Sequence, residues 1–185
     1  MNIAFVCGKG GVGKSTLCYL VALSLREAGK TVSLLDVDPQ KSASAWIDRK
    51  RDGITERGGD LTLVDTPPTL NHEGVLEAIK VADRVIVPCS PSPACLTALG
   101  ATSEVVRRLL KPGAKAFFVL NMVVPRTHLT LDAPEFLNGQ NFGIPLLNTM
   151  IVDRQCVQAS VLRGWSALDD QAQGNFLKLS LEILS

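Results

Sequence analysis

The chain has 185 residues, of which 46% are hydrophobic and 20% are charged. Nineteen Lys and Arg residues nearly balance eighteen acidic ones, and the formal net charge of +1 excludes a globally basic nucleic-acid-binding protein. A chain of this length buries roughly 70% of its unfolded surface, so we predict one compact domain over residues 1–185. The five cysteines are scattered without a C-x-x-C pair, which favours neither a disulfide framework nor a zinc site.

Short apolar runs alternate with amphipathic stretches along the chain. Strands are predicted over residues 3–7, 31–35, 61–64, 85–88 and 116–120, and residues 144–150 are predicted to be extended. Helices are predicted over residues 16–28, 42–51, 75–82, 96–110, 155–162 and 167–184, with a loop between residues 121 and 143. Strands that are apolar on both faces and separated by helices indicate an α/β fold, with a mostly parallel central sheet and helices on both faces.

Polar residues follow the predicted strands at their carboxyl ends. They are Gly8, Asp36, Asp65, the pair Cys89-Ser90, and Asn121. Open α/β sheets bind ligands at this edge, so the sequence predicts a ligand site there. A buried carboxylate is costly unless a cation or hydrogen-bond donors accompany it, which supports functional roles for Asp36 and Asp65.

A glycine-rich loop follows the first predicted strand. Residues 8–15, Gly-Lys-Gly-Gly-Val-Gly-Lys-Ser, match the phosphate-loop pattern G-x-x-x-x-G-K-[ST]. The glycines let backbone N–H groups curl around a β-phosphate, and the following helix offers its positive N-terminal end. In this chemistry Lys14 contacts the β- and γ-phosphates, and the Ser15 hydroxyl ligates Mg²⁺. The loop lies between a predicted strand and a predicted helix, which is the context that the motif requires.

The loop carries a second lysine, Lys9, directly after its first glycine. Residues 9–16 therefore resemble the deviant Walker A motif of the ParA/MinD family of P-loop ATPases. The resemblance implies a homodimer with ATP sandwiched at its interface, in which Lys9 reaches the phosphates bound by the partner subunit. The ATP-binding residues that it implies here are Lys9, Gly10, Gly11, Val12, Gly13, Lys14, Ser15 and Thr16. A solvated lysine at a variable position is the alternative interpretation of Lys9.

Residues 36–40, Asp-Val-Asp-Pro-Gln, are similar to the second motif of that family, D-x-D-P-Q. The resemblance implies that Asp38 positions the attacking water, so that Lys9, Lys14 and Asp38 form the catalytic set. It also implies that Asp36 lies close to the water shell of the metal. Only residues 41–60 separate this motif from the next predicted strand, where family members usually carry an additional helix or strand. This departure leaves the partner that the region binds open.

Residues 63–68, Leu-Val-Asp-Thr-Pro-Pro, resemble the Walker B segment of the family. The resemblance implies that Asp65 holds Mg²⁺ through water, which makes Ser15, Asp36 and Asp65 the metal set. Asn121, at the end of the strand predicted over residues 116–120, is similar to an asparagine that contacts adenine in the family. The guanine-binding pattern N-K-x-D does not occur in the sequence. The implied cofactors are ATP and Mg²⁺.

The resemblance, which is closest to the short ParF-like partition ATPases, also implies an activity. That activity is slow Mg²⁺-dependent ATP hydrolysis by a protein that dimerises on ATP, binds DNA non-specifically and drives partitioning or positioning of DNA or cargo. A small ParB-like protein would stimulate hydrolysis, and the location would be cytoplasmic, with nucleoid association in the ATP-bound state. The alternative is a MinD-like positioning or regulatory ATPase that acts through protein partners without DNA. No membrane association is expected, because the C-terminal residues lack a basic amphipathic extension.

The segment of residues 105–131 contains basic residues but no Asp or Glu. The candidate DNA-contacting residues are Arg107, Arg108, Lys111 and, after dimerisation, Arg154. A solvated helix face is the alternative interpretation of this set. The mixed-charge run over residues 48–52 is predicted to be a solvated helix end.

Overall fold

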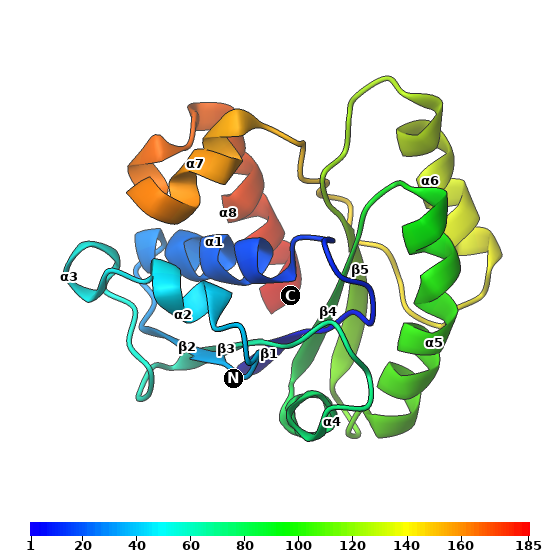
Figure 1. The fold of residues 1–185 in the computed structure, drawn as a ribbon, viewed down its shortest axis with the longest axis horizontal. Coiled ribbons are helices and arrows are strands. Elements are labelled where there is room, and N and C mark those ends of the chain that lie inside the picture. The colour runs from blue at the N-terminus through cyan, green and yellow to red at the C-terminus, as the bar shows by residue number, and fades with distance from the viewer.

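A five-stranded parallel sheet forms the centre of the fold (Figure 1). The computed structural model describes residues 1–185, including all side chains except those of Arg49 and Lys50. The strands are β1 (Asn2–Phe5), β2 (Val32–Asp36), β3 (Leu61–Asp65), β4 (Arg84–Cys89) and β5 (Lys115–Leu120). Their order is β2-β3-β1-β4-β5, and every neighbouring pair is parallel. The sheet confirms the predicted α/β architecture.

Helices cover both faces of this sheet (Figure 1). One layer contains α1 (Lys14–Glu27), α7 (Gln155–Arg163) and α8 (Asp170–Leu184). The other layer contains α4 (Glu73–Val81), α5 (Pro93–Leu109) and α6 (His128–Gly139). Alternate residues of each strand point to opposite faces, and both sets are buried because each layer supplies an apolar surface.

Helix α1 lies deep in the first layer. Every residue from Leu17 to Leu25 is buried, because α1 packs between the sheet and α8. The helix begins directly after Gly13, which adopts the left-handed conformation at φ 82°. The loop that follows β1 is therefore attached to the most buried helix of the fold, which fixes its position at the carboxyl edge of the sheet.

The predicted loop over residues 121–143 contains α6, so that prediction is wrong. Pro134 inside the helix obscures the sequence pattern, since proline removes one backbone hydrogen bond and usually ends a helix. The helix nevertheless forms, because Thr127 caps it through Thr130 N (3.3 Å) and because Ala133 and Leu137 are buried in the second layer. Tertiary packing offsets the local cost of the proline.

Three other predicted elements differ from the structure. The helix predicted over residues 42–51 is divided into α2 (Ser42–Trp46) and α3 (Arg49–Asp52). The final helix begins at Asp170, after a short 3-10 turn at Trp165–Ala167. Residues 144–150 are only partly strand-like. They run along the edge of β5, where Phe118 N donates to Pro145 O and Leu147 N donates to Phe118 O, without forming a regular strand. Within the part of the chain that the structure describes, no helix has the length and hydrophobicity needed to cross a membrane.

Candidate nucleotide-binding site

The glycine-rich loop connects the end of β1 to the first turn of α1 (Figure 1). Gly11 and Gly13 have φ values of 77° and 82°, in the left-handed region that favours glycine. A Cβ atom at Gly13 would collide with the side-chain amide of Asn121. Both glycines are therefore required by geometry, and the loop has the curled form that phosphate binding needs.

Lys14 is buried at the start of α1, with 6% of its surface exposed. Its Nζ donates a hydrogen bond to the backbone carbonyl of Lys9 (3.4 Å). Burial lowers the pKa of Lys14, while the nearby Asp65 and Asp38 carboxylates counteract this effect. A buried ammonium in this position is stabilised when an anion enters the loop, so Lys14 is placed to bind phosphate. Lys9 itself is exposed on the outer side of the loop.

Asp65, the last residue of β3, is completely buried. Neither carboxylate oxygen has a hydrogen-bond partner among the described residues, and the Ser15 hydroxyl lies beside it without completing a hydrogen bond. Burial raises the pKa of Asp65 to about 7, and the neighbouring Ser15 and Lys14 only partly offset this rise. An orphaned buried carboxylate next to a hydroxyl is what a bound cation would satisfy.

The surroundings of Asp65 fit Mg²⁺ better than a metal held by protein alone. Among the residues whose side chains are described, no three His, Cys, Asp or Glu residues gather to hold a metal ion. Mg²⁺ commonly binds through one or two carboxylates together with water and substrate phosphates. The side chains that would hold it here are Asp65 and Ser15.

Asp36 organises the loop that follows β2. Its Oδ1 accepts a hydrogen bond from Asp38 N (3.0 Å), and its Oδ2 accepts one from Ser44 N (3.0 Å). Lys41 Nζ donates to the backbone carbonyl of Asp36. These contacts fix both the D-x-D-P-Q segment and the start of α2. The proposed position of Asp36 near the metal's water shell stays a prediction.

Asp38 lies on the wall of a cavity of about 220 Å³ beside the loop. Its Oδ1 accepts a hydrogen bond from Gln40 N (2.9 Å), which orients the carboxylate. The residues lining the cavity are Gly10, Gly11, Gly13, Lys14, Ser15, Thr16, Asp38, Ser42, Trp46 and Pro68. We call this space the phosphate cavity, because the loop, its buried lysine and Asp38 meet there.

A second cavity, of about 350 Å³, adjoins the other side of the loop. Its lining residues are Gly11, Gly13, Thr16, Asn121, Met122, Val152, Asp153, Val157 and Gln158. Asn121 Nδ2 donates to the carbonyl of Val12 (2.9 Å), which ties the end of β5 to the loop. The mixed apolar and polar lining suits a nucleoside, and we call this space the base cavity.

Sequence reasoning identified Asn121 but missed the part of the base cavity formed by residues 152–158. This segment lies more than thirty residues later in the chain and reaches the site through three backbone hydrogen bonds, one of which Asp153 N donates to Val123 O (3.0 Å). Ile151 N donates to Leu120 O (2.9 Å), and Val123 N donates to Ile151 O (3.0 Å). No motif marks this pairing, so the sequence carries no signal for it.

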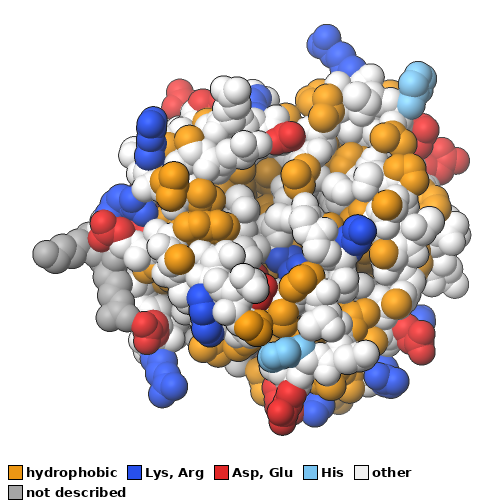
Figure 2. Space-filling view, viewed as in Figure 1, with side chains coloured by type: hydrophobic (Ala, Val, Ile, Leu, Met, Phe, Trp, Pro, Cys, Tyr) orange, Lys and Arg blue, Asp and Glu red, His pale blue; other side chains and the backbone are white. Residues whose placement is uncertain are grey.

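Exposed apolar side chains form a third surface next to the loop. A cavity of about 340 Å³ shares Gly11 with the other two and is lined by Met122, Val124 and Leu129. These three side chains are 40%, 53% and 49% exposed. We call them the apolar shelf; Figure 2 shows hydrophobic side chains on this face of the molecule near α6.

The structure does not bring the four candidate DNA-contacting residues together. Arg107 and Arg108 are exposed in the last turn of α5, which leads to the start of β5. Arg154 follows Asp153, whose backbone N bonds to Val123 O beyond the carboxyl end of β5, and it forms an ion pair with Asp169 (2.7 Å). Lys111 forms an ion pair with Asp83 (2.7 Å). Two of the four charges are thus already paired within the chain.

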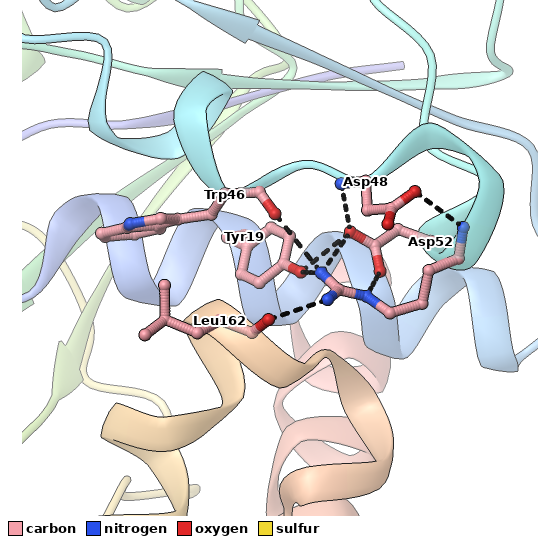
Figure 3. A network of polar contacts seen from close by, with 6 residues as sticks. Tyr19, Trp46, Asp48, Asp52 and Leu162 are labelled. Atoms are coloured by element: carbon pink, nitrogen blue, oxygen red, sulfur yellow. Dashed lines mark hydrogen bonds and ion pairs between the residues drawn. The ribbon is translucent and has the colours of Figure 1, made fainter.

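The prediction of a solvated helix end at residues 48–52 is wrong for Asp52, which is buried. The Asp52 side chain is 1% exposed and forms an ion pair with Arg51 (2.6 Å). Figure 3 shows Asp52 inside a network that includes Tyr19 and Trp46. The side chains of Arg49 and Lys50 lie outside the described residues.

Comparisons with known proteins agree with this geometry. Residues 3–166 match the CobQ/CobB/MinD/ParA nucleotide binding domain. Maintenance of carboxysome distribution protein A from Gloeobacter kilaueensis is 32% identical over 184 residues, covering 90% of this chain and 83% of that protein. The chromosome-partitioning ATPase Soj from Thermus thermophilus is 26% identical over 200 residues, covering 81% and 80%.

The fold is similar to that of a solved relative with a bound nucleotide. The septum site-determining protein MinD from Pyrococcus horikoshii, complexed with Mg-ADP, superposes with a TM-score of 0.71. The match covers 98% of this chain and 95% of that one at 17% identity. The resemblance drawn from the deviant loop is confirmed, because the family match extends over most of the chain. The chain belongs to the CobQ/CobB/MinD/ParA family of nucleotide-binding domains.

Proposed function

We propose that this protein is a Mg²⁺-dependent ATPase that dimerises when it binds ATP. The observation that carries the proposal is the buried, unpartnered carboxylate of Asp65 beside Ser15 and the buried ammonium of Lys14. This arrangement holds an unsatisfied negative charge and a desolvated positive charge at one glycine-rich loop. A metal-bound triphosphate satisfies both charges at once.

Each residue of the loop region has a distinct role in the proposed reaction. Lys14 offsets charge on the phosphates, and Ser15 with Asp65 would hold Mg²⁺, which when bound neutralises charge on the β- and γ-phosphate oxygens. Asp38 lies on the wall of the phosphate cavity and orients the attacking water. Since positioning and electrostatics supply nearly all of the catalysis, we expect slow turnover by the isolated protein and faster turnover with a stimulating partner.

The outer surface of the loop supports an ATP-sandwich homodimer. Lys9 is exposed beside Gly11, and the apolar shelf continues from the same glycine. A second copy placed against this face would cover the shelf and bring its own Lys9 to the bound phosphates. A two-fold axis makes both effects reciprocal, because each copy presents the same surface to the other.

We propose that the ATP-bound dimer positions DNA or a cargo assembly by binding DNA non-specifically. The relatives that support this output act in carboxysome distribution and in chromosome partitioning. Arg107 and Arg108 are the exposed candidates for phosphate contacts, and dimerisation doubles them. A small ParB-like protein would stimulate hydrolysis and release the dimer from the nucleoid.

A MinD-like function through protein partners is the second candidate. The observation that favours it is the ion pairing of Lys111 with Asp83 and of Arg154 with Asp169, which leaves two of the four candidate basic residues neutralised. In that case, the dimer would act through a protein partner that binds the surface formed when ATP brings the two copies together.

Light scattering with ADP, ATP, and ATP plus arbitrary DNA separates these outcomes. We expect a monomer with ADP, a dimer with ATP, and a larger, salt-sensitive complex with ATP and DNA. A dimer that ignores DNA supports the MinD-like candidate. A monomer under every condition contradicts the proposed ATP-sandwich dimer.

A further inference from the structure

The guanidinium of Arg51, in α3, contacts residues of α1, α2 and α7. Figure 3 shows Tyr19, Trp46, Asp52 and Leu162, which belong to this network. Within α3 the guanidinium forms a two-point ion pair with Asp52, through Nε to Oδ1 (2.6 Å) and Nη2 to Oδ2 (3.1 Å). Its remaining contacts are made by Nη1 to Leu162 O in α7 (2.9 Å), by Nη2 to the Tyr19 hydroxyl in α1 (2.9 Å), and by Nη2 to Trp46 O in α2 (3.4 Å). The rigid fork of an arginine suits this role, and a lysine cannot reproduce it.

The buried carboxylate of Asp52 needs hydrogen-bond and charge partners, and the network supplies them. Asp52 Oδ2 also accepts hydrogen bonds from the Tyr19 hydroxyl (2.9 Å) and from Asp48 N (3.0 Å). A carboxylate with 1% of its side chain exposed is tolerated only when it is paired and fully hydrogen-bonded. Arg51 also packs closely against Gly164, where an added Cβ would lie 2.7 Å from Nε. The position of the guanidinium is thus fixed from several sides.

Each helix that Arg51 contacts also contributes to the nucleotide cavities. Tyr19 lies one helical turn after Ser15 on α1. Trp46 itself lines the phosphate cavity, and its ring packs edge-on against Tyr19 with centroids 6.1 Å apart. Leu162 lies one turn after Gln158, which lines the base cavity. Arg51 lines neither cavity.

The network contacts helix α2 at its last residue, Trp46, while Asp36 holds its start. The helix has five residues, of which only Ala43 is buried, so it has little stability of its own. Its Ser42 and Trp46 form part of the wall of the phosphate cavity. If α2 were not held in place, ATP binding would have to order it. The apparent affinity for ATP would then equal the intrinsic affinity multiplied by the fraction of molecules in which α2 is already ordered.

We propose that Arg51 is a positioning residue for the nucleotide site. Its guanidinium holds α2 and α7 in place relative to α1, so that the phosphate cavity and the base cavity are formed before ATP arrives. This inference rests on the proposed ATPase function. Because Arg51 contacts no reacting group, its loss reduces ATP affinity and leaves the chemical step nearly unchanged.

The test compares ATP turnover and ATP binding in the full chain carrying Arg51→Met, Arg51→Lys or Tyr19→Phe. We expect Arg51→Met to raise KM and Kd for ATP about tenfold while kcat stays within about twofold. Arg51→Lys keeps a charge for Asp52 and should restore part of the affinity. Tyr19→Phe keeps the ring against Trp46, loses only the hydroxyl, and should have a smaller effect. Arg57→Met, at an exposed position in the same connecting segment, is the matched control and should behave as wild type.

Tryptophan fluorescence supplies a readout that a purely structural role would not change. The chain contains two tryptophans, so a Trp165→Phe background reports on Trp46 alone. When Arg51 is present, α2 is already in place, so ATP should change the Trp46 emission only through its direct approach to the ring that lines the phosphate cavity. In Arg51→Met, ATP should produce a larger change, because binding then orders the helix.

The outcomes separate this proposal from the proposed function. Unchanged KM and Kd in folded Arg51→Met protein, even with a lower melting temperature, would overturn the positioning role alone. If Arg51→Met does not fold, Arg51→Lys and Tyr19→Phe carry the same comparison, and wild-type affinity in both overturns the role. A wild-type chain that binds no ATP overturns the proposed function and this proposal together.

Discussion

Asp36 and Asp65 lie directly opposite each other at the ends of β2 and β3, yet their carboxylates have different surroundings. Asp36 accepts backbone hydrogen bonds from Asp38 and Ser44, whereas neither oxygen of Asp65 has a hydrogen-bond partner among the described residues. The pairing places a carboxylate that fixes the loop next to a carboxylate that is free for a cation. In the proposed site, Asp36 therefore fixes the loop that follows β2, and Asp65 is the carboxylate without a hydrogen-bond partner that would face the cation.

Replacing the two loop lysines should have different effects. Lys14→Ala removes the buried ammonium and should weaken ATP binding roughly 100-fold, because a charged hydrogen bond to phosphate contributes up to about 3 kcal/mol. Lys9→Ala should bind ATP normally but fail to dimerise or hydrolyse it, since Lys9 is exposed and would act across the interface of the proposed dimer. Calorimetric titration and light scattering measure both, with the exposed Lys30→Ala as the control. ATP-dependent dimers of Lys9→Ala would contradict the deviant-loop assignment.

Asp38→Ala should trap the ATP-bound dimer. The change removes the carboxylate proposed to orient water and leaves Ser15 and Asp65 in place, so kcat should fall at least 100-fold while ATP binding persists. The measurement is phosphate release together with the lifetime of the dimer after ATP is removed. Hydrolysis at the wild-type rate would show that Asp38 has no catalytic role.

The charge of Asp65 should destabilise the nucleotide-free protein at high pH. Its pKa is raised to about 7 in the folded state, from an ordinary value of 3.8, so ionisation opposes folding increasingly as pH rises from about 4 to 7. Asp65→Asn cannot ionise and should be more stable than wild type at pH 8, by up to about 4 kcal/mol, and by less at pH 5. Its melting temperature should therefore exceed that of wild type more at pH 8 than at pH 5. Thermal melts at both pH values check this.

A control measurement on the same variant uses Mg²⁺ and ATP. Together they should raise the melting temperature of wild type, and they should raise that of Asp65→Asn much less, because the amide binds the cation poorly. An equal gain of Asp65→Asn over wild type at pH 5 and pH 8 would show that the buried charge is not the cause.

The apolar shelf should contribute to dimerisation. Burial of one leucine side chain contributes about 1.5–3 kcal/mol, so Leu129→Ser should weaken the ATP-dependent dimer about tenfold or more. Leu181→Ser is the matched control, because Leu181 is 68% exposed near the end of α8. That end lies beside the starts of β4 and β5, away from the loop at their carboxyl ends. Light scattering over a concentration series measures both variants. Equal weakening by the two changes would place the dimer contact elsewhere.

DNA binding, if it depends on α5, should respond to Arg107→Gln and Arg108→Gln. Each lost phosphate contact should lower the salt slope of ATP-dependent binding by roughly one unit, about evenly for unrelated sequences. Arg154→Gln breaks the ion pair with Asp169 and should leave the slope unchanged. ATP turnover, measured in parallel, shows whether the nucleotide site is intact. Wild-type slopes in both α5 variants would place the DNA contacts on another surface.

The sequence by itself determined the features that depend on neighbouring residues. The glycine-rich loop, its two lysines and the D-x-D-P-Q segment are continuous, so their chemistry can be recognised without the fold. The strands were located within a few residues because each is a compact apolar run, and a parallel sheet then places their carboxyl ends at one edge. Asp36 and Asp65 could be assigned to the site for this reason.

Only the tertiary structure decided which distant segments complete the site. Asn121 reaches Val12, residues 152–158 reach the loop, and Arg51 joins α1, α2 and α7. Packing likewise allowed α6 to form around Pro134, and it paired Lys111 with Asp83. These contacts join residues far apart in the chain, and their free energy comes from burial and hydrogen bonds that exist only after folding. Sequence patterns report local preferences, and they carry no record of which buried partner each charge will find.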